Sequence, residues 1–327
     1  MDKIKKVLFF LVKVFIAAAI IYWLVREERL VFSSFTDIDL TIRNVLLVLM
    51  GALSVFTGLF LLALRLMLLL KHLQFDIIYP KLLGFTMVGA FLGTVLPGLV
   101  GGDAVKAAYL YGNVEERKLE AITAVMADRI VGLYSLILLG TMTMLISLLF
   151  GAIPVDEKIL ALTVGATAGI GLGAYVFSRD FFLNLKPVKS TMRKLPTIFQ
   201  RVIAVFKSSL SNPKLIFSLI GLSLLNHLFV IVSFTIGAFL LKDSLAAYMY
   251  FVINPIAMLM NAIPVTPGGI GITESAFSFL YESAGSPSGA AVGLLGRLIQ
   301  YIVFFMGGTI SIFYVKIRAG DKNGDTR

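Results

Sequence analysis

The fold is decided by two short stretches of sequence, Leu96-Pro97-Gly98-Leu99-Val100-Gly101-Gly102-Asp103 and Ile263-Pro264-Val265-Thr266-Pro267-Gly268-Gly269-Ile270. Both contain Pro-x-x-x-Gly-Gly, and each stands between an apolar segment and a shorter helical pattern, 102–112 or 273–283. Proline and paired glycines end a helix and leave backbone groups unpaired. An unpaired backbone group in hydrocarbon costs several kcal/mol. Each break is therefore predicted to lie within protein or to line a wet cavity.

The rest of the chain is apolar enough to cross a membrane several times. Of its 327 residues, 58% are apolar and 15% are charged, and the mean hydropathy is +0.92. A soluble domain is about half apolar and a quarter charged. The apolar stretches fall at 7–25, 45–70, 82–97, 121–150, 159–178, 215–241, 245–263 and 289–316. Their lengths suit spanning helices rather than barrel strands, and the polar stretches are too short for a soluble domain. We therefore predict one transmembrane domain over 1–327.

The two breaks also predict an inverted internal repeat. If 82–112 and 245–285 are re-entrant helical hairpins, the other six of the eight apolar segments cross the membrane, and both termini share one side. The first half, 44–178, and the second half, 215–316, then enclose hairpins that enter from opposite sides. Inverted repeats with broken helices at midplane are typical of secondary transporters. The expected fold class is an all-α polytopic membrane protein with about six spans and two re-entrant hairpins.

The loop charges predict the orientation. Of the 29 Lys and Arg, four lie at membrane depth and twenty lie in loops on the side of the termini. The other five lie on the opposite side: Arg26, Arg29, Arg43, Lys158 and Lys242. Cytoplasmic loops are rich in Lys and Arg. We therefore expect both termini in the cytoplasm and the protein in the inner membrane.

A basic segment, 179–214, separates the two halves. It carries eight Lys and Arg and a single acid, Asp180. One interpretation is a surface helix pair lying on anionic headgroups. The other is a retention signal that fixes topology and binds nothing. Under either interpretation the net charge of +10 serves the membrane, and no nucleic-acid partner is expected.

Seven ionisable side chains lie at membrane depth, where each is costly unless paired or hydrated. They are Arg65, Lys106, Arg129, Arg297, Asp103, Asp128 and Glu274. Asp103 and Lys106 are three residues apart on one helix and can pair. Asp103 can instead cap that helix. The two interpretations predict different positions for its carboxylate.

The other five charged residues have different predicted partners. Asp128 and Arg129 are adjacent and face different directions, so each is expected to pair with another segment. Arg129 and Arg65 lie near helix ends, where a long side chain can snorkel to the interface. Arg297 lies well inside 289–316 and shares its face with Gln300 and Tyr301. Its most obvious partner is Glu274, either as a structural bridge or within a site for a headgroup or coupling ion.

The helices that restart after the two breaks point their N-termini into the membrane interior. Free amide groups and the helix dipole make such a place suited to an anion, and phosphate is the natural candidate. The candidate substrate-binding residues are Gly101, Gly102, Asp103, Lys106, Asp128, Arg129, Pro267, Gly268, Gly269, Glu274 and Arg297. No catalytic residue, metal site or cofactor is expected, because the chain has two histidines, no cysteine and no Walker-type phosphate loop.

Three motifs in this order resemble those of a known family. They are Val95-Leu96-Pro97-Gly98…Gly101-Gly102-Asp103…Lys106, then Asp128-Arg129-Ile130-Val131-Gly132, then Pro264…Thr266-Pro267-Gly268-Gly269-Ile270-Gly271…Glu274. The chain resembles the lysylphosphatidylglycerol synthase transmembrane-region family, also called flippase-like, over nearly its whole length. In fused members of that family the membrane part is joined to a cytoplasmic aminoacyl-transferase domain and is understood to flip the aminoacylated lipid.

The resemblance implies a standalone member without the transferase, since the chain stops at Arg327, soon after its last span. Family members often have arginine where Lys106 stands here. Lysine keeps the positive charge, but it cannot bind a phosphate through two parallel hydrogen bonds as arginine does. The resemblance therefore implies a phosphate contact at this position without identifying the headgroup.

The leading hypothesis is a flippase or transporter that moves a phospho- or glycolipid between leaflets without ATP. The alternatives are a lipid-modifying enzyme such as a phosphatidylglycerol lysyltransferase, and a non-transporting scaffold in an envelope-lipid pathway. An enzyme is not expected, because no site for an acyl donor or tRNA is evident outside the basic segment. The expected partners are membrane phospholipids or other anionic lipids, with a homodimer and a separate lipid-modifying enzyme as further options.

Overall fold

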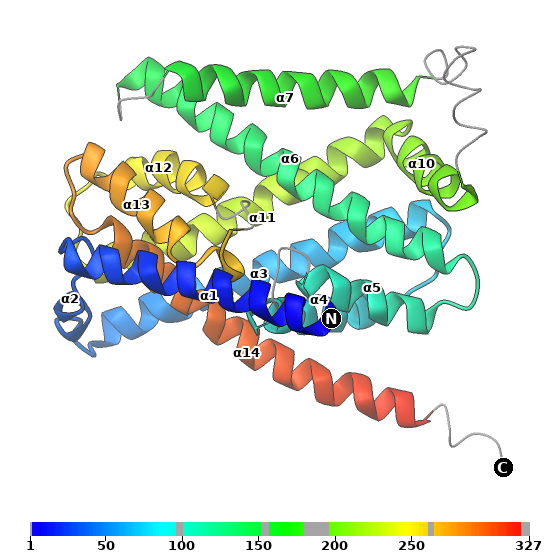
Figure 1. The fold of residues 1–327 in the computed structure, drawn as a ribbon, viewed down its shortest axis with the longest axis horizontal. Coiled ribbons are helices and arrows are strands. Elements are labelled where there is room, and N and C mark those ends of the chain that lie inside the picture. Colours follow the sequence, from blue (N-terminus) through cyan, green and yellow to red (C-terminus); the bar gives the residue numbers. More distant parts are fainter. Residues whose placement is uncertain (1, 96–100, 152–156, 180–195, 261–264, 322–327) are drawn as a thin grey trace.

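The structure is a computed structural model that describes residues 2–95, 101–151, 157–179, 196–260 and 265–321 (Figure 1). Residues 96–100 of the first break and 263–264 of the second lie outside these ranges, and so do residues 180–195 of the basic segment. The described chain folds into twelve α-helices and one 3-10 helix. The helices are α1 (Asp2–Arg26), α2 (Ser33–Thr36), α3 (Ile42–His72), α4 (Tyr79–Val95), α5 (Gly101–Asn113), α6 (Lys118–Phe150), α7 (Glu157–Ser178), α10 (Thr197–Leu210), α11 (Pro213–Leu240), α12 (Ala247–Leu259), η2 (Pro267–Gly269), α13 (Ile272–Ser283) and α14 (Gly289–Asp321).

The predicted all-helical, polytopic membrane fold is confirmed. Five helices in the described ranges are long and apolar enough to cross a membrane: α3, α6, α11 and α14, and α7 over its residues 160–178. They correspond to five of the six stretches expected to span. The apolar helix α12 is shorter, at 13 residues. The short helices α5, α12 and α13 therefore lie next to the two breaks in the sequence.

Local signals place the ends of the long helices. Thr41 caps α3 by accepting a hydrogen bond from the Asn44 amide, and Asn212 caps α11 in the same way through the Leu215 amide. Pro213 stands at the first position of α11, where a missing amide hydrogen costs nothing. Gly151 ends α6 with a φ of 64°, a conformation that glycine adopts freely.

The first helix of each short pair packs on a long helix of the other half. The long helices α3 and α11 pack along each other at the centre. Helix α4 packs on α14 and α12 packs on α6, while α5 packs on α6 and α13 packs on α14. The pair α4–α5 lies toward one end of the molecule, and the pair α12–α13 lies toward the opposite end (Figure 1). The contacts that one short pair makes with the long helices α3, α6, α11 and α14 have counterparts made by the other pair.

Glycine allows α4 and α5 to touch backbone to backbone. A methyl group added to Gly102 of α5 would lie 2.5 Å from the carbonyl oxygen of Gly89 in α4. One turn further along α4, Gly93 faces the same residue, with the Gly102 amide 3.3 Å from the position of an added methyl. Small residues four apart permit this close approach in membranes. The crossing brings the start of α5 against the middle of α4.

Candidate functional site

A cavity of about 300 Å³ lies between the two halves and is lined by residues of α3, α4, α5, α6, η2 and α14. It brings together segments that are more than 160 positions apart in sequence, since both Gly102 and Gly268 face it. Seven of the eleven predicted site residues line it: Gly102, Asp103, Lys106, Arg129, Gly268, Gly269 and Arg297. The two glycine-rich breaks therefore converge on one space.

The first half contributes a cluster of one acid and two cations. Asp103, the third residue of α5, bonds through one carboxylate oxygen to Lys106 Nζ at 2.7 Å and through the other to Arg129 of α6. The predicted pairing of Asp103 with Lys106 is confirmed, and Arg129 finds its partner on another helix as expected. The side chains of Asp103 and Lys106 are each 12% exposed, and that of Arg129 is 33% exposed. Two positive charges and one negative charge leave one net positive charge at the cavity wall.

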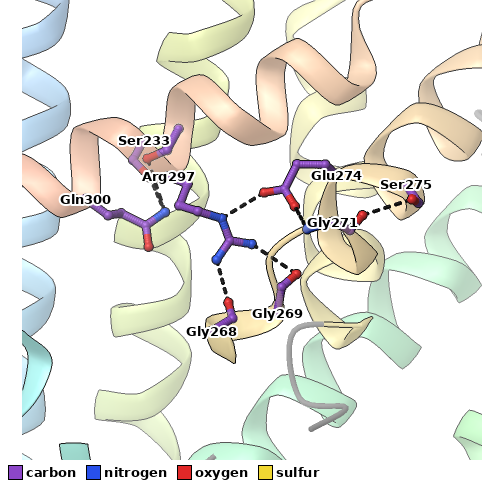
Figure 2. A network of polar contacts seen from close by, with 9 residues as sticks. Ser233, Gly268, Gly269, Gly271, Glu274, Ser275, Arg297 and Gln300 are labelled. Carbon is purple, nitrogen blue, oxygen red and sulfur yellow. Dashed lines mark hydrogen bonds and ion pairs between the residues drawn. The ribbon is translucent and has the colours of Figure 1, made fainter. Parts of the chain in front are cut away.

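In the second half, Arg297 forms an ion pair with Glu274 and also contacts backbone carbonyl groups (Figure 2). Arg297 of α14 donates from Nε to Glu274 Oε1 at 2.7 Å and from a terminal nitrogen to the Gly268 carbonyl oxygen at 2.5 Å. Its other terminal nitrogen lies 3.5 Å from the Gly269 carbonyl oxygen. The predicted Arg297–Glu274 pairing is confirmed. Arg297 thus holds the η2 turn as well as the acid of α13.

Glu274 is fully buried and does not line the cavity. Its second oxygen accepts a hydrogen bond from the Gly271 amide at 2.6 Å, so it ties down the start of α13 (Figure 2). Gly268, Gly269 and Gly271 have φ values of 59°, 71° and 87°, which non-glycine residues rarely adopt. The geometry of this turn explains why the sequence has glycine at all three positions.

Two other predicted site residues, Pro267 and Asp128, also lie outside the cavity lining. Gly101 begins α5 and Pro267 begins η2. Asp128 faces away from the cavity and forms a two-pronged bridge with Arg65 of α3, at 2.6 and 2.8 Å. Its predicted pairing with another segment is confirmed.

Arg65 corrects the sequence interpretation. The sequence left snorkelling open for Arg65, yet the side chain is buried, with its guanidinium bonded to Asp128 and, at 2.8 Å, to Ser223 Oγ of α11. It does not snorkel because α3 turns this face toward α6 and α11. A bidentate carboxylate partner makes burial less costly than extension to the interface.

Hydroxyl and amide side chains complete the wall, most of them unnoticed in the sequence. Thr86 and Thr94 of α4 donate to backbone carbonyls of their own helix, and Gln300 of α14 donates to Ser233 Oγ at 3.2 Å. Thr266, just before η2, also lines the cavity and is buried. Its hydroxyl has no hydrogen-bond partner within the described residues. The only signal in the sequence was a threonine between the two prolines of the second break.

The described residues bring no three His, Asp or Glu side chains close enough to hold a metal ion. What the arrangement offers is a small cavity inside an apolar protein, with a surplus positive charge at Lys106 and Arg129 and several hydroxyl groups in its wall.

Comparison with known proteins gives two matches. A family profile described as "Lysylphosphatidylglycerol synthase TM region" matches residues 10–308. The chain is also 26% identical over 336 aligned positions to "UPF0104 membrane protein PH1989" of Pyrococcus horikoshii. That alignment covers 94% of this chain and 96% of the relative. Both matches run across the two breaks and the cavity between them.

Proposed function

Since the chain belongs to the lysylphosphatidylglycerol synthase transmembrane-region family, we propose that it moves a lipid with a polar headgroup between membrane leaflets without ATP. One observation carries the proposal: a chamber within a multi-pass membrane protein is walled by Lys106, Arg129, Arg297 and Asp103. Ionisable groups within a membrane are costly, and those that face a cavity mark polar pathways. A headgroup would pass through the chamber while its acyl chains stay in the bilayer.

The short helices support two re-entrant hairpins. The lengths of α5, α12 and α13 are 13, 13 and 12 residues, so each extends only about 20 Å at 1.5 Å per residue. A hydrocarbon core about 30 Å thick needs about 20 residues. Helices α4 with α5, and α12 with α13, would then enter and return on one side. The six full spans would be α1 and the five long helices.

Corresponding ion pairs support an inverted repeat. In each half a span, two short helices and a second span follow in order: α3 to α6, and α11 to α14. The third residue of the second short helix is an acid that pairs with an arginine of the next span. These pairs are Asp103–Arg129 and Glu274–Arg297. The packing agrees with this order, because α4 packs on α14 of the second half and α12 packs on α6 of the first half.

The charge distribution supports cytoplasmic termini in an inner membrane. Helix α1 begins, and α14 ends, toward the side of the molecule where α4 and α5 lie (Figure 1). The same side carries α10 with Arg201 and Lys207, in keeping with the excess of Lys and Arg in cytoplasmic loops. In this orientation the α4–α5 pair would open to the cytoplasm and the α12–α13 pair to the outside.

A lipid-flipping assay on reconstituted protein tests the proposal. Vesicles containing lipids with a fluorescent acyl chain are treated with dithionite, which bleaches only the outer leaflet. We expect wild-type protein to let bleaching proceed beyond the outer half, and Ala90→Trp, which fills the chamber from α4, to stop it.

Ala168→Trp is the matched control, because Ala168 lies on the exposed side of α7, away from the chamber. It should flip lipid like wild type. If wild-type vesicles bleach no further than protein-free vesicles, the protein does not flip these lipids. If Ala90→Trp remains fully active, the lipid does not use this chamber.

A further inference from the structure

The chamber's chemistry selects one class of headgroup. Resting on the proposed function, we infer that the translocated lipid carries a monoanionic phosphodiester joined to a small hydroxylated group such as glycerol. The family is named after a lipid with a cationic aminoacyl group, and the chamber fits the anionic lipid without that group better.

The first step is the distribution of charge. Arg297 is neutralised by Glu274 and held by the Gly268 carbonyl, so it brings no surplus charge to the chamber. Asp103 is shared between Lys106 and Arg129. The surplus is one positive charge, carried by that cluster beside the start of α5. A phosphodiester carries one negative charge and would balance it, with charge-assisted hydrogen bonds from Lys106 and Arg129.

The second step is the absence of a place for an ammonium group. Asp103 is the sole carboxylate on the described wall of the chamber, and both of its oxygens are already bonded to cations. Glu274 is sealed behind Arg297. An aminoacylated headgroup would place its ammonium among three cations without a free acid, which like-charge repulsion and desolvation oppose.

The third step is the hydroxyl of Thr266. Thr266 is 4% exposed and faces the chamber, and its Oγ1 has no partner among the described residues. A buried hydroxyl without a partner costs free energy, and a ligand can remove that cost only where it can reach the hydroxyl, as it can at a chamber wall. A ligand hydroxyl would satisfy it. The free acceptor capacity of Thr86 and Thr94 on α4 extends the same surface.

The size of the chamber limits the hydroxylated group. A volume of about 300 Å³ is room for about ten water molecules. A glycerol phosphate fits that space. The inferred class is therefore a lipid with a phosphoglycerol-like headgroup.

The test compares three lipids that share an acyl-chain label in the dithionite assay: phosphatidylglycerol, phosphatidylethanolamine and lysylphosphatidylglycerol. We expect wild-type protein to flip phosphatidylglycerol about tenfold faster than the other two, because the ammonium groups of those two lipids find no free carboxylate in the chamber, and one unsatisfied buried polar group typically costs about that factor. Equal rates for all three, or faster flipping of lysylphosphatidylglycerol, would overturn the inference while leaving lipid translocation intact. Background rates for all three would instead refute the proposed function.

Two isosteric variants isolate the hydroxyl. Thr266→Val should slow phosphatidylglycerol flipping several-fold while the melting temperature stays the same or rises, because an unsatisfied hydroxyl is removed. Thr273→Val is the matched control, since Thr273 is also buried with an unpartnered hydroxyl but lies outside the chamber lining. It should flip lipid like wild type. Equal rates for both variants would show that Thr266 does not contact the headgroup.

A soluble phosphodiester separates a lipid substrate from a free one. Glycerophosphoglycerol has the same headgroup without acyl chains. Vesicles loaded with the radiolabelled compound should retain it while they flip phosphatidylglycerol. Release as fast as lipid flipping would overturn the assignment to a lipid.

Discussion

At the scale of single residues, the structure divides the membrane-embedded charges into those that face the chamber and those that only hold helices together. Lys106 and Arg129 belong to the first group. Arg65 and Asp128 belong to the second, since they bond to each other and are buried away from the chamber. Arg297 does both, because it lines the chamber while its guanidinium holds Glu274 and Gly268.

Loss of Arg65 should destabilise the fold strongly. Arg65→Ala leaves Asp128 as an unpaired buried charge, a change that costs about 3–5 kcal/mol in comparable cases. We expect a large drop in the thermal unfolding midpoint of the detergent-solubilised protein. Combining Arg65→Ala with Asp128→Leu should restore much of the lost stability. Arg43→Ala, at an exposed position of α3, is the control and should change little; equal stability of Arg65→Ala and Arg43→Ala would contradict a structural role for the bridge.

At the scale of helices, the chamber depends on how closely α4 and α5 approach. Gly102→Ala would place a methyl group 2.5 Å from the Gly89 carbonyl oxygen and so force the helices apart. Such overpacking costs about 1–3 kcal/mol. We expect a lower unfolding midpoint and slower lipid flipping.

Gly112→Ala is the control for this substitution, because Gly112 lies in the same helix with open space around it. Alanine favours a helix by about 1 kcal/mol over glycine, so Gly112→Ala should leave stability unchanged or raise it. A Gly102→Ala protein as stable as wild type would mean that the α4–α5 contact is not tight.

A loop clamp at the opposite end of the molecule gives a pH dependence. Burial raises the pKa of Asp243, but hydrogen bonds from Ser286, Ser288, the Leu245 amide and Tyr250 outweigh it and hold the pKa below its ordinary value. The folded state therefore favours the ionised acid. Its stabilising effect is complete above the unfolded pKa of about 3.9 and is lost as pH falls through the folded pKa.

Asp243→Asn should accordingly lower the unfolding midpoint by a few degrees at pH 7. The difference from wild type should shrink below about pH 4, as protonation removes the same charge from wild type. Thermal unfolding of both proteins between pH 7 and pH 3 measures this. A difference that stays constant across the range would show that the charge of Asp243 does not hold the clamp.

At the scale of the whole molecule, the proposed inverted repeat makes a topological prediction. The chain has no cysteine, so single cysteines report their own location. We expect Glu27→Cys and Ser283→Cys to react with a membrane-impermeant maleimide in intact cells, and Glu116→Cys to react only after lysis. Labelling of positions 116 and 283 from the same side would contradict the inverted repeat.

The sequence predicted those parts of the molecule that depend on local order. Hydropathy located the long helices, Pro-x-x-x-Gly-Gly located the breaks, and a three-residue spacing paired Asp103 with Lys106. The sequence did not predict the Arg65–Asp128 bridge or the Gly89–Gly102 contact. Both depend on how each helix is rotated about its axis, and nearly uniform apolar faces carry little information about that rotation. Thr266 was missed because an unsatisfied hydroxyl is recognised only once its neighbours are known.

The corresponding ion pairs of the two halves have a consequence for motion. The Asp103–Arg129 pair is partly exposed, whereas the Glu274–Arg297 pair is buried. If the protein transports lipid as proposed, alternating access requires a second state in which these exposures are exchanged. Adding phosphatidylglycerol should then change deuterium uptake in opposite directions at 101–112 and 266–276. Parallel changes at both would mean that the chamber opens without such a rocking motion.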